Sequence, residues 1–250
     1  EKIEAGATRQ DLLNLLPPSA ARNAVDAALW DLEAKKSGRP VWEVANLPQP
    51  QPLTTAYTIS FNTAEAMGQQ ALKNATRPLL KLKLAKADDF DRVQAVRKNA
   101  PDSQLIVDAN EGWTIDTLEN LVPKLKALDV KLIEQPLPAS EDDALKGRKY
   151  DIPLCADESC RKIQALPDLA QKYQYINVKL DKTGGLTHAL DFIGEAQKHN
   201  LKLMIGCMVG TSLSMAPAML LGPLAEFVDL DGPLRSEEHT SELQSRSVIS

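Results

Sequence analysis

Residues 104–108 read Gln-Leu-Ile-Val-Asp, and the same pattern, a short apolar run closed by a carboxylate, returns in residues 131–134 (Lys-Leu-Ile-Glu) and 154–157 (Leu-Cys-Ala-Asp). The carboxylates follow one another at intervals of 26 and 23 residues, which is close to the length of one strand and helix unit in a barrel of alternating strands and helices. Because the parallel strands of such a barrel end at one rim, we expect the three side chains to gather there. They are Asp108, Glu134 and Asp157.

Strand-like and helix-like runs alternate over most of the chain. Apolar residues at helical spacing predict seven helical segments, among them 89–99, 115–128 and 186–200. Such alternation demands parallel strands covered by helices, and eight of them close into a TIM-like (β/α)7β barrel of the α/β class. The rival fold, an open doubly wound sheet, is disfavoured because no glycine-rich phosphate loop follows the first strand. The expected strands are 53–60, 78–84, 104–108, 131–134, 152–156, 175–180, 202–206 and 226–230.

The two ends of the chain differ from this pattern. Ser19 is a typical N-cap residue, apolar residues at helical spacing follow it, and Gly38 is a typical stop, so we expect a helix over 19–37. Residues 235–250 read like the translation of a common sequencing adapter, and we expect them to be a non-native tail. The first residue is Glu1 rather than Met, which leaves a preceding targeting segment open.

The composition is that of an ordinary folded domain, with 43% hydrophobic and 25% charged residues. The formal net charge is −5; residues 235–250 hold two arginines and three glutamates, so they contribute −1 and the rest carries −4. A mildly acidic chain lacks the basic surface that nucleic-acid binding needs, and no apolar stretch reaches the roughly 18 residues of a membrane span. The cysteines form neither a disulfide framework nor a zinc motif, which fits a reducing, cytoplasmic setting.

Residues 80–84, Leu-Lys-Leu-Lys-Leu, place lysines on one face of a strand and leucines on the other, because side chains alternate along a strand. On a barrel strand the leucines would meet the helices, so Lys81 and Lys83 would point inward. Ionisable groups in such a setting usually serve chemistry. The alternative is a lysine-rich strand at a sheet edge, but the second strand of a closed barrel has no edge.

Oxygen-only donors at three strand ends favour a hard cation such as Mg²⁺, so we expect Asp108, Glu134 and Asp157 to be metal ligands. For any single carboxylate, a helix cap is the simpler interpretation. Placement on three consecutive strands favours the metal site. Asn110 and Glu158 are candidates for contacts behind these ligands.

Lys179 closes the sixth expected strand, in Asn-Val-Lys-Leu-Asp-Lys. The second and sixth strands of an eight-stranded ring lie opposite each other, so Lys83 and Lys179 would face each other across the barrel. A substrate held by the metal between them would have one amine on each side of a single carbon. This arrangement predicts removal of a proton from one face and its return to the other, which is racemisation or epimerisation.

Asp229 and Asp231 lie on one face at the end of the eighth expected strand, in Phe-Val-Asp-Leu-Asp-Gly-Pro. Two carboxylates directed into a pocket would favour a cationic group of the substrate and repel an additional anion. The alternative is a capped turn that leads into the Gly-Pro pair.

These motifs together resemble the enolase superfamily, in its muconate-lactonising branch. The shared elements are Lys-x-Lys, Asp-Ala-Asn, Glu-Gln-Pro, Ala-Asp-Glu-Ser and Val-Lys-Leu-Asp-Lys-Thr-Gly-Gly, in that order, within residues 19–234. Sites of this superfamily combine a Lys or His base with Mg²⁺ that stabilises an enediolate. The roles that the resemblance implies are Mg²⁺ ligation by Asp108, Glu134 and Asp157, acid/base chemistry by Lys83 and Lys179, and contact of Lys81 with the substrate carboxylate.

The Asp-x-Asp motif, with Thr-Gly-Gly at 183–185 and Cys-Met at 207–208, is similar to that of the dipeptide epimerases, in which the acidic pair receives the α-ammonium group. The resemblance implies Mg²⁺-dependent epimerisation of a dipeptide of the L-Ala-D/L-Glu type by two-base 1,1-proton transfer through an enediolate. Three activities of the same family stay open: o-succinylbenzoate synthase, muconate cycloisomerase and N-acylamino acid racemase. An alternative from a different class is an inactive barrel fragment that binds Mg²⁺ or a dipeptide.

The resemblance also divides the chain. In the family, an N-terminal α+β domain caps the barrel and excludes water from the site. By this comparison, residues 1–50 are a remnant of the capping domain with its connecting helix, 51–234 are the barrel with the catalytic site, and 235–250 are the non-native tail. The chain is then truncated at both ends and expected to be poorly active as written. Whether it forms a homo-oligomer stays open.

Overall fold

The computed structural model describes residue 3 and residues 5–235 of the chain. Eight strands in this part form one sheet in the order β1 to β8, and every pair with a defined register is parallel. This sequential order excludes the doubly wound alternative, in which the strand order reverses at a switch point. The strands are β1 Tyr57–Ile59, β2 Leu79–Lys83, β3 Gln104–Asp108, β4 Val130–Glu134, β5 Leu154–Ala156, β6 Tyr175–Lys179, β7 Lys202–Gly206 and β8 Phe227–Asp229.

The helices begin and end largely where the sequence predicts. Ser19 caps α2 with its side chain, which accepts a hydrogen bond from the backbone N–H of Arg22, and Gly38 ends that helix in the left-handed conformation. The α-helices are α1 Arg9–Leu15, α2 Ala20–Ser37, α3 Val41–Val44, α4 Ala64–Lys73, α5 Asp89–Asn99, α6 Ile115–Ala127, α7 Leu166–Leu169, α8 Leu180–Thr183, α9 Leu186–Lys198 and α10 Ser212–Met219. The 3₁₀ helices are η1 Asp142–Leu145, η2 Ile163–Ala165, η3 Gly222–Leu224 and η4 Gly232–Arg235.

Two of the seven expected helical connections are much shorter than predicted. Between β4 and β5 the chain forms only η1, and between β5 and β6 it forms η2 and the four-residue α7. Pro136 and Pro138 explain the first case, because proline removes a backbone donor and disfavours helical geometry in the residue before it. Both connections therefore reach the strand ends as irregular segments rich in polar side chains.

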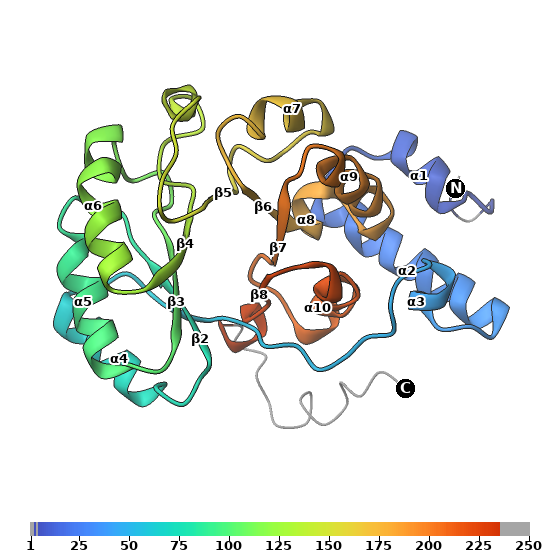
Figure 1. Ribbon diagram of the computed structural model, residues 1–250. Coiled ribbons are helices and arrows are strands. Elements are labelled where there is room, and N and C mark those ends of the chain that lie inside the picture. The colour runs from blue at the N-terminus through green and yellow to red at the C-terminus, as the bar shows by residue number, and fades with distance from the viewer. Residues whose placement is uncertain (1–2, 4, 236–250) are drawn as a thin grey trace. The chain divides into compact units, whose positions relative to one another are not determined.

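The described residues divide into two compact units. The terminal unit comprises residues up to 53, 178–198 and 203 onward, and the central unit comprises 54–177 and 199–202. In the central unit α4, α5 and α6 cover one face of β2, β3 and β4 (Figure 1), and in the terminal unit α8 and α9 pack against α2.

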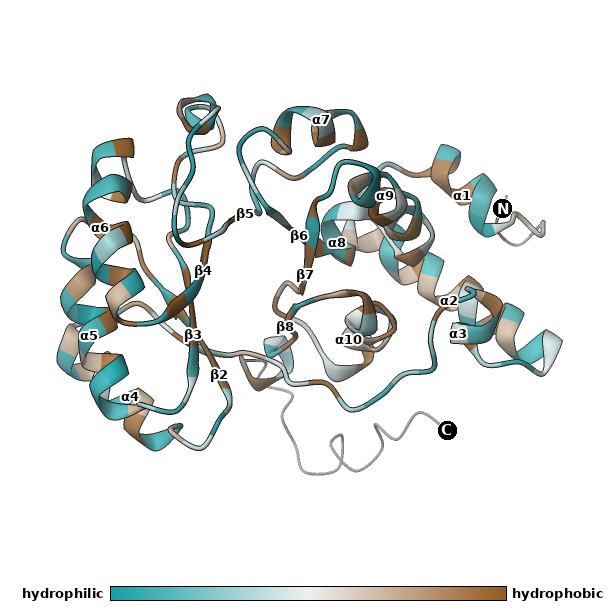
Figure 2. Cartoon of the chain, in the orientation of Figure 1, coloured by the Kyte–Doolittle hydropathy of each residue, from teal (hydrophilic) through white to brown (hydrophobic). Residues whose placement is uncertain are grey.

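Burial in the central unit follows the alternation of its strands. Leu80, Leu82 and Leu84 are at most 1% exposed, as the period of two in residues 80–84 predicts for the face under the helices. Strands β3 and β4 are hydrophobic along much of their length, whereas α4, α5 and α6 carry hydrophobic and hydrophilic residues on different sides (Figure 2). The leucines of β2 thus pack under the helices, while the charged residues Lys83 and Asp108 end their strands.

Three further predictions concern cysteines, membranes and the tail. Cys155, Cys160 and Cys207 are free thiols. No helix among residues 3 and 5–235 combines the length and the apolar content of a membrane span. Apart from Arg235, the expected adapter-like tail lies outside the described residues.

Candidate active site

Three charged residues of the central unit end neighbouring strands, namely Lys83 in β2, Asp108 in β3 and Glu134 in β4. Lys83 lies opposite Asp108, and Asp108 lies opposite Glu134. Glu134 in turn lies opposite Cys155, which is two positions before Asp157. The registers thus place these groups at nearly the same level of the sheet, where alternate residues share a face.

Both lysines of β2 contact Asp108. Lys81 Nζ lies 2.6 Å from Glu134 Oε2 and 3.2 Å from Asp108 Oδ2, and Lys83 Nζ lies 2.6 Å from the same Asp108 oxygen. The side chains of Lys81, Asp108 and Glu134 are at most 1% exposed, whereas that of Lys83 is 32% exposed. A buried ammonium between two buried carboxylates offsets the desolvation of all three groups. Lys83 is therefore the more accessible of the two amines.

The donor set of this cluster fits a hard divalent cation. Among residues 3 and 5–235 no three His, Cys, Asp or Glu side chains form a ready group for a metal ion, and Lys81 bridges Asp108 and Glu134 instead. Carboxylate oxygens nevertheless dominate the cluster, as Mg²⁺ prefers. Asn177 Nδ2 donates to Glu134 Oε1 at 2.7 Å, while Asn177 Oδ1 is buried without a hydrogen-bond partner in this part of the chain. An oxygen in that state is satisfied by a cation or a water.

Asp157, the third expected ligand, is held through its backbone. It follows β5 directly and is 2% exposed. Its N–H donates to the side-chain oxygen of Gln135 at 2.9 Å, and the N–H of Ser159 donates to the same oxygen at 3.2 Å. One amide group from the end of β4 thus holds the segment after β5.

Lys179 lies in the terminal unit, where it ends β6, precedes α8 and is 7% exposed. The turn after α8 contains Gly184 and Gly185, with φ values of 77° and 120°. Arg22 of α2 donates to the carbonyl oxygens of Thr183 at 2.7 Å and Gly184 at 2.9 Å. A Cβ atom on Gly184 would lie 2.6 Å from Arg22 Nε, so a glycine is needed for this close approach.

A second charged residue of α2 holds the next stretch. Asp26 accepts hydrogen bonds from the backbone N–H of Thr187 at 3.0 Å and from its hydroxyl at 2.5 Å. A Cβ atom on Gly185 would lie 2.6 Å from Asp26 Cβ. Asn23 adds a 2.8 Å hydrogen bond to the Asp181 carboxylate. Helix α2 therefore fixes the segment that follows Lys179.

The acidic pair lies at the end of β8 in the same unit. Asp229 lies opposite Gly206, and Asp229 and Asp231 are each 6% exposed. Burial, and after it the charge of Asp229, raises the pKa of the Cys207 thiol to about 11. Asp229 and Cys207 are thus close enough to interact electrostatically.

The structure brings four predicted residues into contact, namely Lys81, Lys83, Asp108 and Glu134. Their catalytic and ligand roles, and those of the other predicted residues, stay predictions. The sequence interpretation missed Asn177, although its position two residues before Lys179 on one strand was a usable signal. It also missed the contacts of Gln135 and of Arg22, whose partners lie far along the chain.

Comparison with known families agrees with this geometry. Residues 63–242 match the family "Enolase C-terminal domain-like", and residues 4–45 match "Mandelate racemase / muconate lactonizing enzyme, N-terminal domain". The ordered parallel sheet with its lysine and carboxylate strand ends defines the class of enolase-type α/β barrels. The chain belongs to the enolase superfamily, in its mandelate racemase and muconate lactonizing enzyme branch.

Curated relatives of the chain are isomerases by name. An N-acetyl-D-glutamate racemase from Pseudoalteromonas sp is 52% identical over 224 residues, which cover 90% of this chain and 71% of the relative. The L-Ala-D/L-Glu epimerase of Escherichia coli (strain K12) is 42% identical over 234 residues, 93% of this chain and 73% of the relative. The resemblance stated from the motifs is thereby confirmed at the level of the family.

Solved structures confirm the barrel fold. An enolase family member from Agrobacterium tumefaciens with homology to dipeptide epimerases, with bound sodium and L-Ala-L-Glu, superposes with a TM-score of 0.89 at 50% identity and covers 93% of this chain and 72% of that one. A dipeptide epimerase from Methylococcus capsulatus complexed with Mg ion has a TM-score of 0.83 at 31% identity, with 90% and 69% covered.

Proposed function

We propose that this protein epimerises a dipeptide of the L-Ala-D/L-Glu type, with Mg²⁺ bound by Asp108, Glu134 and Asp157. The observation that carries the proposal is the cluster in which both lysines of β2, Lys81 and Lys83, contact the buried carboxylates that end β3 and β4. The relatives named as dipeptide epimerases, one of them solved with Mg ion, support it. The sodium ion in another relative supports the same preference for a hard cation.

When bound, Mg²⁺ would stabilise the negative charge that develops on the substrate carboxylate as the α-proton leaves. The protein's own groups do the rest. Lys81 neutralises the ligand carboxylates, and its proposed role in the reaction is contact with the substrate carboxylate. Asn177 holds Glu134 through a 2.7 Å hydrogen bond.

The proton chemistry falls to Lys83 and Lys179. One enters the reaction as a neutral amine and takes the α-proton into its lone pair, and the electron pair of the broken C–H bond remains on the substrate. The other enters as an ammonium and returns a proton to the opposite face of the same carbon. Proton number and charge balance over the turnover, and the two lysines exchange roles for the reverse direction.

Asp229 and Asp231 are proposed to receive the α-ammonium group of the dipeptide. Two nearly buried carboxylates are stabilised by a cationic partner and destabilised by an anionic one. The second candidate is racemisation of an N-acylated glutamate, which the 52% identical N-acetyl-D-glutamate racemase favours. Such a substrate has no ammonium group, so the acidic pair separates the two proposals.

A matched substrate pair tests this. N-propionyl-glutamate is alanyl-glutamate with hydrogen in place of the ammonium group, and both are followed by proton NMR with Mg²⁺. Epimerisation of L-Ala-L-Glu, slowed by Asp229→Asn and Asp231→Asn without loss of N-propionyl-glutamate turnover, supports the dipeptide proposal. Turnover of the N-acyl compound alone supports the racemase. If this chain and a chain joined to a complete family cap are both silent on both compounds, the proposed function is contradicted.

We also propose the division into residues 1–50 as capping-domain remnant with connecting helix and 51–234 as catalytic barrel. The matched ranges 4–45 and 63–242 support it. Limited proteolysis that cuts first between residues 45 and 57, where no helix or strand is formed, is the expected result.

A further inference from the structure

We propose that Gln135 and Asp142 are positioning residues for the carboxylates that end β4 and follow β5. Through one chain of hydrogen bonds they would set the spacing between Glu134 and Asp157. The inference rests on the proposed metal site, and it adds residues to which neither the sequence motifs nor the comparisons give a role.

Gln135 links the two strand ends directly. It follows Glu134 in the chain, is completely buried, and has a positive φ of 33°, a backbone conformation that non-glycine residues adopt only where the surroundings enforce it. Its backbone N–H donates to the carbonyl oxygen of Cys155 at 2.8 Å. Its side-chain oxygen accepts from the N–H groups of Asp157 at 2.9 Å and Ser159 at 3.2 Å. Main chain and side chain of Gln135 thus both bind the β5 end.

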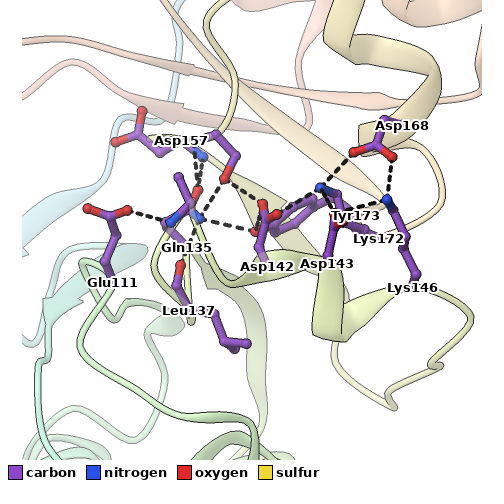
Figure 3. Close-up of polar contacts among 12 residues, drawn as sticks. Glu111, Gln135, Leu137, Asp142, Asp143, Lys146, Asp157, Asp168, Lys172 and Tyr173 are labelled. Atoms are coloured by element: carbon purple, nitrogen blue, oxygen red, sulfur yellow. Dashed lines mark hydrogen bonds and ion pairs between the residues drawn. The ribbon is translucent and has the colours of Figure 1, made fainter.

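The other end of the Gln135 amide has an excess of acceptors. Nε2 lies 2.9 Å from the carbonyl oxygen of Leu137, 2.9 Å from Ser159 Oγ and 3.1 Å from the hydroxyl oxygen of Tyr173. An amide nitrogen has two hydrogens, so these three oxygens hold it from different directions (Figure 3). The amide cannot flip without placing its oxygen against them and its nitrogen against two backbone N–H groups.

Asp142 determines which groups of this network donate hydrogen bonds and which accept them. Its Oδ2 accepts from the Ser159 hydroxyl at 2.6 Å and from the Tyr173 hydroxyl at 3.0 Å, and its Oδ1 accepts from Lys172 Nζ at 2.7 Å. Because both hydroxyl hydrogens point to a carboxylate that can only accept, the hydroxyl oxygens turn their lone pairs to Gln135 Nε2. The charge of Asp142 therefore orients Gln135, and Gln135 orients the Asp157 segment.

At the outer end of the network Asp142 has a cationic partner, Lys172. Lys172 is 6% exposed and also lies 2.7 Å from Asp168 Oδ2 and 3.1 Å from Asp143 Oδ1. Burial alone would lower the pKa of Lys172, but the hydrogen bonds to Asp142 and its neighbours raise it above the usual range. Burial also raises the pKa of Tyr173, so its hydroxyl keeps the proton that it donates to Asp142.

Metal affinity is the property that this network controls. Partners that hold a ligand in place typically change metal affinity by roughly 10- to 100-fold when removed. Asp142 lies in the irregular connection between β4 and β5, so it fixes the strand ends without being part of the sheet.

The test uses the full chain with three substitutions. Gln135→Met keeps the shape and removes all side-chain hydrogen bonds, and Asp142→Asn keeps the shape and removes the charge. Lys146→Met is the matched control, because Lys146 contacts Asp143 and Asp168 at the outer edge and belongs to the same charge cluster. Mg²⁺ affinity is measured by calorimetry and Mn²⁺ affinity by electron paramagnetic resonance. Hydrogen exchange of the Asp157 and Ser159 amides is measured without metal.

We expect Gln135→Met to raise the Mg²⁺ dissociation constant about 10-fold or more and to speed hydrogen exchange of both amides. Asp142→Asn should have the same two effects to a smaller extent. Lys146→Met should change the Mg²⁺ affinity by less than about 2-fold. Wild-type affinity and wild-type exchange in a folded Gln135→Met protein would overturn the inference. If that variant does not fold, Asp142→Asn decides. If the wild-type chain binds no divalent cation, the proposed function fails separately, and unchanged amide exchange in the variants would then overturn the positioning role as well.

Discussion

Two segments that carry candidate catalytic groups are held in opposite ways. The segment after Lys179 is held from outside by Arg22 and Asp26 of α2, residues about 160 positions away in the chain. The segment that begins with Asp157 is held from within the central unit by Gln135, which is 22 positions away. The first depends on two glycines that admit charged side chains, and the second on one oriented amide. The segment after Lys179 should therefore be sensitive to changes in α2, whereas the segment that begins with Asp157 should be sensitive to changes at Gln135.

Gly185→Ala, in the segment after Lys179, should give the largest loss of stability. Its φ is 120° and the new Cβ would meet Asp26 Cβ at 2.6 Å, so strain and overlap together should lower the unfolding free energy by about 4 kcal/mol. Gly147→Ala is the matched control, because Gly147 also has a positive φ, 73°, with nothing within 4 Å of the new Cβ; about 1 kcal/mol is expected there. Urea unfolding measures both. Equal losses would show that Asp26 does not confine Gly185.

Arg22→Met should give the next largest effect. The buried guanidinium donates to the carbonyls of Thr183, Gly184 and Leu16, and their loss should lower the unfolding free energy by about 3 kcal/mol. The turnover number should fall more than the Mg²⁺ affinity, because Arg22 holds the segment after Lys179 and contacts none of the three proposed ligands through the hydrogen bonds given above. Arg39→Met, at an exposed ion pair with Glu43, should change stability by less than about 1 kcal/mol. A fall in Mg²⁺ affinity alone would contradict the division between the segments.

The charge cluster of Asp143, Lys146, Asp168 and Lys172 should give the protein a broad pH optimum of stability. Hydrogen bonds from Lys146 and then Lys172 lower the pKa of Asp143 and of Asp168. Their contribution is complete above the ordinary carboxyl pKa of about 4 and is lost as pH falls through the lowered values. The raised pKa of Lys172 contributes below about pH 10.4 and is lost as pH rises through the raised value. In Lys172→Met the free energy of unfolding should fall less steeply as the pH is lowered into the acid range. Urea unfolding at several pH values measures this, and a profile identical to that of the wild type would contradict the network.

The smallest expected effect is a change in the reactivity of Cys207 when the charge of Asp229 is removed. With a pKa of about 11, Cys207 should react slowly with iodoacetamide at pH 8, and the rate should rise until about pH 11. Asp229→Asn should shift that profile to lower pH, because the Asp229 charge raises the thiol pKa. Peptide mass spectrometry separates Cys207 from Cys155, whose pKa is raised well above its ordinary value by burial. An Asp229→Asn profile identical to that of the wild type would show that the two side chains do not interact.

The sequence predicted most of the barrel because its signal repeats. Strand and helix runs of nearly constant length recur, and β3 and β7 have the predicted bounds. The predicted helix between β4 and β5 is absent, because Pro136 and Pro138 disfavour it, and only η1 forms there. Lys83, Asp108 and Glu134 were visible because each lies at a strand end, and Lys81 was visible because it alternates with leucines on the same strand as Lys83. The contacts of Asp142 with Ser159 and Tyr173 were not, because irregular segments have no period and their partners meet only in three dimensions.

Stereospecific exchange in D₂O tests whether two lysines act as bases on opposite faces of one carbon. Separate samples of L-Ala-L-Glu and L-Ala-D-Glu are incubated with Mg²⁺ and with wild-type protein, Lys83→Ala or Lys179→Ala, and the glutamate α-proton is followed by NMR. Each variant should lose epimerisation by about 10³-fold or more but still exchange the α-proton of one isomer. The two variants should differ in which isomer they exchange. Exchange of the same isomer by both, or full epimerisation by either, would contradict the two-base mechanism.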